Sequence, residues 1–204
     1  MNDFPAKLQA RAARKTAKRD EKKRQIAASA LNALKELGYA NTSLRDIAEK
    51  SDMSLGMLHY YFEDRSDLII YCVTIYKQEF VRAVTKALTA ASGRDEVIEA
   101  FSEALVASII EDEMTHRLWY DIRNQAMFDV TFRPVVTEIE AMLIGTVGAA
   151  FDKAGHKIPP AQVAIYYALV DGAFRYLMQD QFSATPRSRR ALQSIFRDLL
   201  GQFL

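Results

Sequence analysis

The chain has 204 residues, of which 50% are hydrophobic and 26% are charged, and it contains 8 Gly and 5 Pro. This composition predicts a folded protein with a sizeable core, and it excludes a disordered or collagen-like chain. The 27 basic and 26 acidic side chains give a formal net charge of +1. The charge of the whole chain therefore does not mark a nucleic-acid binder.

The basic side chains are concentrated at the N-terminus. Residues 1–24 contain nine Lys or Arg and three acidic residues. This segment is either an arm that reaches into a groove of DNA or a solvated extension, and the sequence leaves both interpretations open.

Cysteine content and hydropathy predict a cytoplasmic protein with no membrane partner. The single cysteine, Cys72, cannot form an intrachain disulfide and offers no zinc-type spacing, which fits a reducing compartment. No uninterrupted apolar run approaches the roughly 18 residues that a membrane span needs. The basic N-terminus is not followed by the apolar core of a signal peptide.

Apolar residues recur with helical spacing along nearly the whole chain, and the alternating pattern of half-buried strands is absent. The sequence therefore predicts an all-α fold of about nine helices. We expect them at residues 19–37, 43–51, 54–62, 64–91, 94–110, 113–126, 130–154, 160–181 and 187–203. Gly38 supplies a left-handed stop for the first helix, and the Ser43-x-x-Asp46 pattern marks the start of the second.

The two short helices at 43–51 and 54–62 are joined by a tight turn, which predicts a helix-turn-helix. Its inward residues should be Ile47, Ala48, Met53, Leu58 and Phe62, leaving Leu55, Met57, His59, Tyr60 and part of Tyr61 outward. Tyrosine hydroxyls can bond phosphate oxygens, and Arg45 could bond a guanine edge or a phosphate. Gly56 would let the backbone approach DNA closely. A helix hairpin with purely structural aromatic packing remains the alternative.

Residues 42–68, TSLRDIAEKSDMSLGMLHYYFEDRSDL, resemble the DNA-binding signature of the tetracycline-repressor (TetR/AcrR) family. The likeness includes the small residues at the start, the Arg-x-Ile-Ala core, the Ser-x-Gly start of the recognition helix and the Tyr-Phe end. Asp52 stands where the family usually has a turn glycine, and Asp also adopts left-handed backbone conformations. A shorter segment, residues 167–174, is similar to the branch that contains choline-responsive repressors of betaine synthesis.

The resemblance implies a ligand-responsive, homodimeric transcriptional repressor that a small molecule releases from a palindromic operator in double-stranded DNA. It implies a basic flexible arm at 1–18, a DNA-binding domain at 19–64, and a ligand-binding and dimerisation domain at 65–204. By family position, phosphate contacts fall on Thr42, Ser43, Tyr60, Tyr61 and Arg65. Groove-facing or base-facing positions are Arg45, Leu55, Met57 and His59, and Ser54 and Gly56 begin the recognition helix.

A mixed aromatic and polar cluster in the C-terminal half predicts the effector pocket, because ligand pockets are mostly apolar with a few placed polar groups. Its members are Trp119, Tyr120, Asp121 and Arg123, with Tyr167 and Asp171 on a later helix as the facing wall. A choline-type analogy would suit a quaternary ammonium held by aromatic faces and a carboxylate. Neutral aromatic or lipophilic ligands are equally open, as is an ordinary core in which Asp171 pairs with Arg175.

The last two helices carry more apolar surface than one helix hairpin can cover. The candidate dimer-interface residues are Tyr166, Leu169, Ala173, Leu192, Phe196 and Leu199. Packing two copies of this pair would give a four-helix interface. The alternative is that these residues are buried wholly within one subunit.

Other classes of function have weaker support. The three histidines, His59, His116 and His156, lie far apart without a metal-ligand repeat, and no phosphate-binding Gly loop is present. We therefore expect no enzyme, no catalytic residues, no metal and no cofactor. A helical adaptor that binds protein partners is the remaining alternative.

Overall fold

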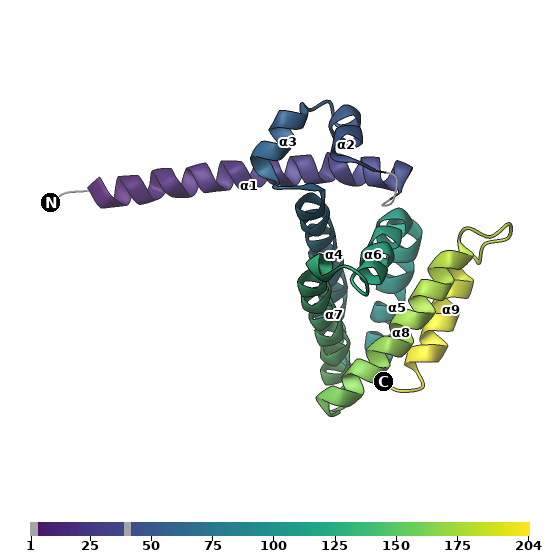
Figure 1. The fold of residues 1–204 in the computed structure, drawn as a ribbon. Coiled ribbons are helices and arrows are strands. Elements are labelled where there is room, and N and C mark those ends of the chain that lie inside the picture. The colour runs from purple at the N-terminus through teal and green to yellow at the C-terminus, as the bar shows by residue number, and fades with distance from the viewer. Residues whose placement is uncertain (1–3, 39–41) are drawn as a thin grey trace. The chain divides into compact units, whose positions relative to one another are not determined.

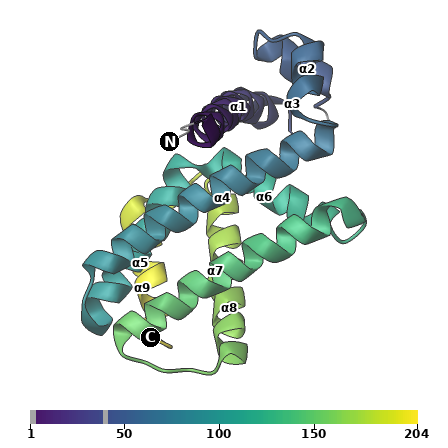
Figure 2. The same ribbon diagram turned by 90° about the vertical axis from the view of Figure 1, so that its left-hand side faces the viewer.

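The computed structural model describes residues 4–38 and 42–204, which fold as helices and connecting turns without a strand among them (Figures 1 and 2). The helices are α1 (Phe4–Leu37), α2 (Leu44–Lys50), α3 (Leu55–Tyr61), α4 (Arg65–Ala90), α5 (Gly93–Glu111), α6 (Glu113–Gln125), the 3-10 turn η1 (Val130–Phe132), α7 (Arg133–Ala154), α8 (Pro160–Asp180) and α9 (Arg189–Leu200). The all-α prediction is confirmed.

The first helix is longer than the sequence pattern predicted. It begins at Phe4 rather than near Arg19, so residues 4–18 of the proposed arm belong to α1. Residues 13–21 of this helix present no buried apolar stripe, because their side chains are all exposed. They are nevertheless rich in Ala, Lys and Arg, which favour helix intrinsically.

The chain forms two compact units, Met1–Val73 and Thr74–Leu204, with the division inside α4. The core of the first unit joins α1, α2, α3 and the first turns of α4 around Ile26, Ile47, Leu58 and Leu68. The Cys72 thiol lies in this core and donates to the carbonyl oxygen of Ala27 at 3.5 Å.

Turn geometry fixes the helix-turn-helix within the first unit. Gly38 ends α1 with φ of +77°, and Asp52 lies in the turn between α2 and α3 with φ of +49°. Both were predicted to adopt left-handed backbone, which glycine tolerates freely and aspartate tolerates better than most residues. The predicted inward residues are confirmed: Ile47, Ala48, Leu58 and Phe62 are buried, and Met53 packs partly buried against them.

The second unit is a helical body in which α5 contacts α6, α7, α8 and α9. The helices α8 and α9 lie side by side (Figure 1). Among the described residues, 130–154 is the one stretch long and apolar enough to cross a membrane by length and composition. Its side chains Val135, Ile139, Leu143 and Val147 are buried in this unit, as expected of a core helix.

Candidate nucleic-acid interface and effector site

The start of α2 is fixed by a reciprocal pair of side-chain caps. The backbone N–H of Ser43 donates to Oδ2 of Asp46 at 2.7 Å, and the backbone N–H of Asp46 donates to Oγ of Ser43 at 3.2 Å. The Ser43 hydrogen bonds hold the pKa of the Asp46 carboxyl below its usual value. This capping box satisfies two N–H groups that a helix start leaves without partners, and it positions the exposed Arg45 on the first turn.

The second helix of the pair, α3, presents an exposed face of aromatic and polar side chains. Ser54 caps it by accepting from the backbone N–H of Met57 at 3.1 Å. Tyr60 is 69% exposed, and its ring meets that of Tyr61 edge to face at 4.9 Å. Met57 and His59 are also exposed, whereas Leu55 is half-buried.

Gly56 lies on the same exposed face, and packing inside the chain does not explain why this residue is glycine. A Cβ atom placed there would meet no heavy atom within 4 Å. The fold therefore does not require glycine at this position, although glycine in a helix lowers its stability.

Two predicted phosphate contacts differ in their availability to solvent. Thr42 is buried, and its hydroxyl donates to the carbonyl oxygen of Gly38 at 2.5 Å, so this side chain is committed to the end of α1. Arg65, at the start of α4, is half-buried. Near α2 and α3, Lys50 is paired with Glu36. Much of the other positive charge of this unit lies on α1.

The exposed basic side chains of α1 are Arg11, Arg14, Lys15, Lys18, Arg19 and Arg24. Lys23 lies apart from them, since its ammonium sits 4.8 Å from the ring centroid of Phe62. An exposed set of positive charges of this kind attracts phosphate groups.

The second unit contains a cavity of about 40 Å³ that side chains from five helices line. From α4 to α8 these are Lys77, Phe80, Val84, Phe101, Leu105, His116, Tyr120, Leu143, Thr146, Val147, Tyr167, Val170, Asp171 and Phe174. The predicted ligand-site residues Tyr120, Tyr167 and Asp171 are thus brought together, from two helices about 50 residues apart in the chain.

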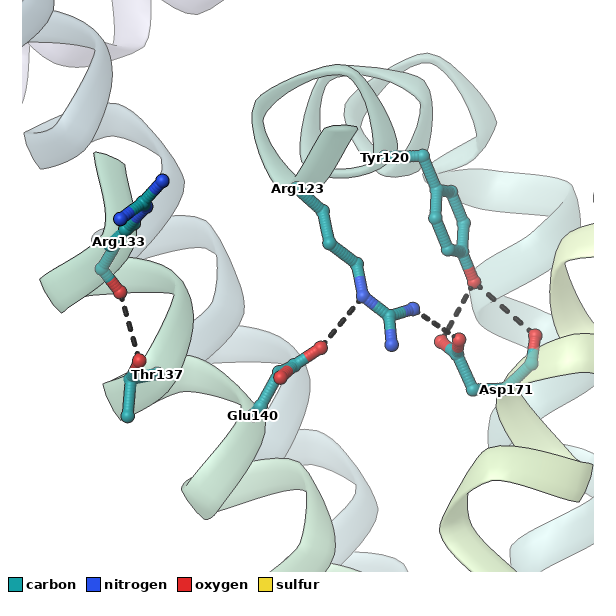
Figure 3. Close-up of polar contacts among 6 residues, drawn as sticks. All are labelled: Tyr120, Arg123, Arg133, Thr137, Glu140 and Asp171. Carbon is teal, nitrogen blue, oxygen red and sulfur yellow. Dashed lines mark hydrogen bonds and ion pairs between the residues drawn. The ribbon is translucent and has the colours of Figure 1, made fainter. Parts of the chain in front are cut away.

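A polar network connects one wall of this cavity to the surface (Figure 3). The Asp171 carboxylate accepts from the Tyr120 hydroxyl at 3.0 Å and from Nη1 of Arg123. The Arg123 Nε also lies 2.7 Å from Oε1 of Glu140. Burial and the neighbouring Asp171 charge raise the pKa of Tyr120, so its hydroxyl remains a donor.

This network corrects the expected pairing of Asp171 with Arg175. The guanidinium of Arg175 instead lies over the Tyr120 ring, 5.4 Å from its centroid. Sequence spacing suggested the neighbour four residues along the same helix, but α6 provides the closer partner.

A buried pair of basic side chains, Lys77 and His116, also lines the cavity. Lys77 is 3% exposed, and its Nζ lies 3.3 Å from Nδ1 of His116. The Nε2 of His116 lies 2.7 Å from the Ser108 hydroxyl oxygen. With Lys77 donating to Nδ1, the imidazole is neutral and carries its hydrogen on Nε2.

The remaining predicted ligand residues lie outside the cavity lining. Trp119 is fully buried, with its ring centroid 5.1 Å from Nζ of Lys77. Asp121 is exposed on the other side of α6. Arg123 reaches the site only through Asp171.

Four of the predicted dimer-interface residues keep surface for a partner, and two do not. Leu169 is 50% exposed, and Tyr166, Ala173 and Leu199 are half-buried. Leu192 and Phe196 have 0% exposure within one subunit. Their prediction as interface residues is corrected, because a side chain enclosed by its own chain cannot contact a second copy.

The family description for bacterial regulatory proteins of the tetR family matches residues 26–72. Over 191 residues, the chain is 23% identical to the HTH-type transcriptional regulator BetI of Burkholderia mallei (strain NCTC 10229), covering 91% of this chain and 95% of that protein. The matched region holds α2, α3 and the exposed face described above.

Solved structures show the same fold. A protein of Mesorhizobium loti MAFF303099, assigned to the TetR family, has a TM-score of 0.73 and 20% identity over 91% of this chain and 96% of its own. The multidrug binding protein EbrR in complex with imidazole has a TM-score of 0.65 and 21% identity, covering 87% and 93%.

Proposed function

Because the chain belongs to the TetR family of bacterial regulatory proteins, we propose that it is a transcriptional repressor that binds a palindromic operator as a homodimer. The exposed aromatic and polar face of α3, held by the capped α2–α3 pair, is the observation that carries this proposal. A helix presented in this way can enter the major groove. We infer a cytoplasmic location, where operator DNA is found.

The contacts divide by chemistry. Tyr60, Tyr61 and Ser43 suit phosphate oxygens, whereas Arg45 can form paired hydrogen bonds to a guanine edge. Leu55 and Met57 have no hydrogen-bond donors in their side chains, so they would read methyl groups and groove shape. Residues 19–64 would then form the DNA-binding domain and 65–204 the ligand-binding and dimerisation domain.

The effector would bind at the cavity of the second unit. A small molecule there changes operator affinity only through its different affinity for the DNA-binding and released conformations. Tight binding alone would therefore not make it an inducer.

The dimer would use the exposed apolar stripe of α8. Ile165, Leu169 and Tyr176 are 62%, 50% and 61% exposed and recur at helical spacing. Gly172 lies between them, and a Cβ there would meet no atom of its own subunit. A second copy of α8 could approach closely at this point.

Gel shift and footprinting on DNA upstream of the protein's own gene test operator binding. We expect a protected inverted repeat whose half-sites lie about one helical turn, or somewhat more, apart. Arg45→Ala should change the preference at one base pair by about 1–3 kcal/mol, while Tyr60→Ala should weaken binding to related operators evenly.

The control is Arg82→Ala, which removes an exposed arginine from the middle of α4. It should leave operator affinity unchanged. If neither recognition variant alters binding, or if the wild-type chain shows no preference for any inverted repeat, a helical adaptor becomes the better interpretation.

A further inference from the structure

The cavity of the second unit presents donors without matching acceptors. An ammonium group has three N–H donors. Within residues 42–204, Lys77 Nζ makes one side-chain hydrogen bond, to Nδ1 of His116. The Tyr167 hydroxyl lines the same cavity, and its oxygen is buried without a hydrogen-bond partner among the described residues. Buried donors of this kind call for an acceptor from outside the chain.

The nearby carboxylates are already engaged. Asp171 accepts from Tyr120 and Arg123, and Glu140 pairs with the same arginine. Arg123 therefore compensates both acids, and Lys77 has no carboxylate in direct contact within the described part of the chain. The chemistry of these donors suits an anion.

Aromatic rings enclose the Lys77 ammonium. Its Nζ lies 5.3, 5.1 and 5.1 Å from the ring centroids of Tyr76, Phe80 and Trp119. This is the geometry by which aromatic faces hold a cation, but the cation is the protein's own. A quaternary ammonium ligand would meet a like charge when Lys77 is protonated, which argues against this one of the ligand classes that the sequence left open.

The rest of the lining is apolar. Val84, Leu105, Leu143, Val147 and Val170 contribute aliphatic surface. A ligand that satisfies both parts of the cavity has an acidic head and a hydrocarbon body.

We propose that the effector is a small carboxylic acid with an aliphatic or aromatic body, whose carboxylate pairs with Lys77 and accepts a hydrogen bond from Tyr167. This assignment rests on the proposed function. Since the cavity is small, about 40 Å³, we expect the lining helices to separate when a larger acid binds. Binding is thereby coupled to the conformation of this unit.

The titration of the site agrees with this geometry. Burial lowers the pKa of Lys77 to about 7, with Arg123 reinforcing the shift and Asp171 and Asp112 opposing it. Burial, and then the Lys77 charge, lower the pKa of His116 well below its usual value. A bound carboxylate favours the charged ammonium, so binding at pH 8 takes up a proton.

Tyr76, Tyr120 and Tyr167 also face this site, and burial raises the pKa of each. They stay protonated at pH 8. Lys77 is therefore the group that takes up the proton.

Isothermal titration calorimetry on the full-length chain tests the assignment with hexanoate, benzoate, the two matched primary amides and phenyltrimethylammonium. Each acid should bind at least about tenfold more tightly than its amide, because the charged head gains a charge-assisted hydrogen bond. The emission of Trp119, the single tryptophan, should change over the same concentration range.

Two variants separate the roles of the donors. Lys77→Met keeps an unbranched side chain of similar length and should reduce the acid-over-amide preference to about twofold or less. Tyr167→Phe should lower acid affinity by about threefold to tenfold while leaving amide affinity less affected. Lys86→Met, at an exposed lysine of the same helix, is the matched control and should keep the full preference.

Calorimetry in two buffers of different ionisation enthalpy measures the proton uptake. The binding of hexanoate should be accompanied by the uptake of close to one proton at pH 8 and almost none at pH 6. Lys77→Met should abolish this uptake. Equal binding of acid and amide, tighter binding of the ammonium ion, or a preference that survives Lys77→Met would each overturn the assignment.

A gel shift with the same compounds distinguishes failure of the proposed ligand class from failure of the proposed repressor function. Acids that bind through Lys77 and release the wild-type chain from its operator support both proposals. An operator complex that forms and responds only to non-acidic compounds overturns the ligand class alone. A chain that binds no operator fails as a repressor, whatever the calorimetry gives.

Discussion

The burial of Lys77 in the second unit lowers the free energy of unfolding. Moving an ammonium ion out of water into a protein interior carries a desolvation penalty of several kcal/mol, even after relaxation. Three aromatic rings and one imidazole nitrogen compensate only part of that penalty. A methionine of similar length would fill the same space without it, so this lysine serves something other than stability.

Lys77→Met should therefore raise the free energy of unfolding at pH 7 by about 1–4 kcal/mol. The pKa of Lys77 is about 7 in the folded chain and 10.5 when exposed, so between these values the unfolded wild-type chain binds more protons. The free energy of unfolding of the wild-type chain therefore rises with pH in this range, by up to about 1.4 kcal/mol per pH unit.

The advantage of Lys77→Met should consequently shrink from pH 7 to pH 9. Urea denaturation at pH 7, 8 and 9 measures it, and this window avoids the protonation of His116, whose pKa lies lower. A constant difference would mean that Lys77 stays charged in the folded chain across this window, as it is in the unfolded chain.

The sequence held a signal for this residue that hydropathy conceals. Lys77 lies four residues after Val73 and three before Phe80, which places it on the apolar face of its helix. Its burial could have been suspected from that position. Its partners could not, because His116 and Trp119 come from a helix about 40 residues further along.

At the scale of elements, the short helix α3 contains a glycine that lowers its stability. Gly56 occupies its first turn, where an added methyl group would meet no neighbour within 4 Å, and glycine has more backbone freedom to lose than alanine on folding. Nothing inside the first unit explains that choice. Close approach of the α3 backbone to DNA would explain it.

Gly56→Ala should therefore separate stability from binding. It should raise the free energy of unfolding by about 0.4–1 kcal/mol while weakening operator binding, because the added methyl group meets the sugar-phosphate surface. Thermal denaturation and gel shift measure the two effects.

The matched control is Gly145→Ala. Gly145 is also exposed and helical, with no atom near an added Cβ, but it lies in α7. It should show a similar stability gain with unchanged operator affinity. Equal operator affinity for wild type and Gly56→Ala would remove the close-approach role.

Element boundaries were predictable where local chemistry sets them. The Ser43–Asp46 caps and the left-handed Gly38 and Asp52 act over a few residues, so the sequence contains the whole interaction. The start of α1 was missed because intrinsic propensity, without an apolar stripe, leaves little pattern to detect.

Long-range side-chain partners could not be predicted from the sequence, for a different reason. Arg123, Glu140 and Asp171 meet only when α6, α7 and α8 pack together. Periodicity assigns a residue to a face, but it does not say which face of another helix lies opposite.

At the scale of the whole molecule, the exposed apolar stripe of α8 is the proposed dimer surface. Leu169→Glu should dissociate the dimer, because the carboxylate would be buried against a second copy without a counter-ion. Sedimentation velocity should report about twice the 23.1 kDa chain mass for wild type and about one chain mass for the variant.

Val130→Glu changes another exposed apolar residue, outside α8, and should leave the dimer intact. Wild type that sediments as a monomer at micromolar concentration would contradict the proposal. Phe196 is unsuitable for this test, since its complete burial means that a charge there would unfold the subunit.

The enclosed position of Cys72 has a practical consequence. Burial raises the pKa of its thiol to about 12, and a thiol in that state reacts slowly with alkylating reagents. Because it is the chain's only cysteine, a second one introduced at an exposed site such as Arg45 can carry a nitroxide label with little background. Two copies labelled in this way would let electron-spin distance measurements follow the separation of the recognition helices as effector is added, without removing the native residue.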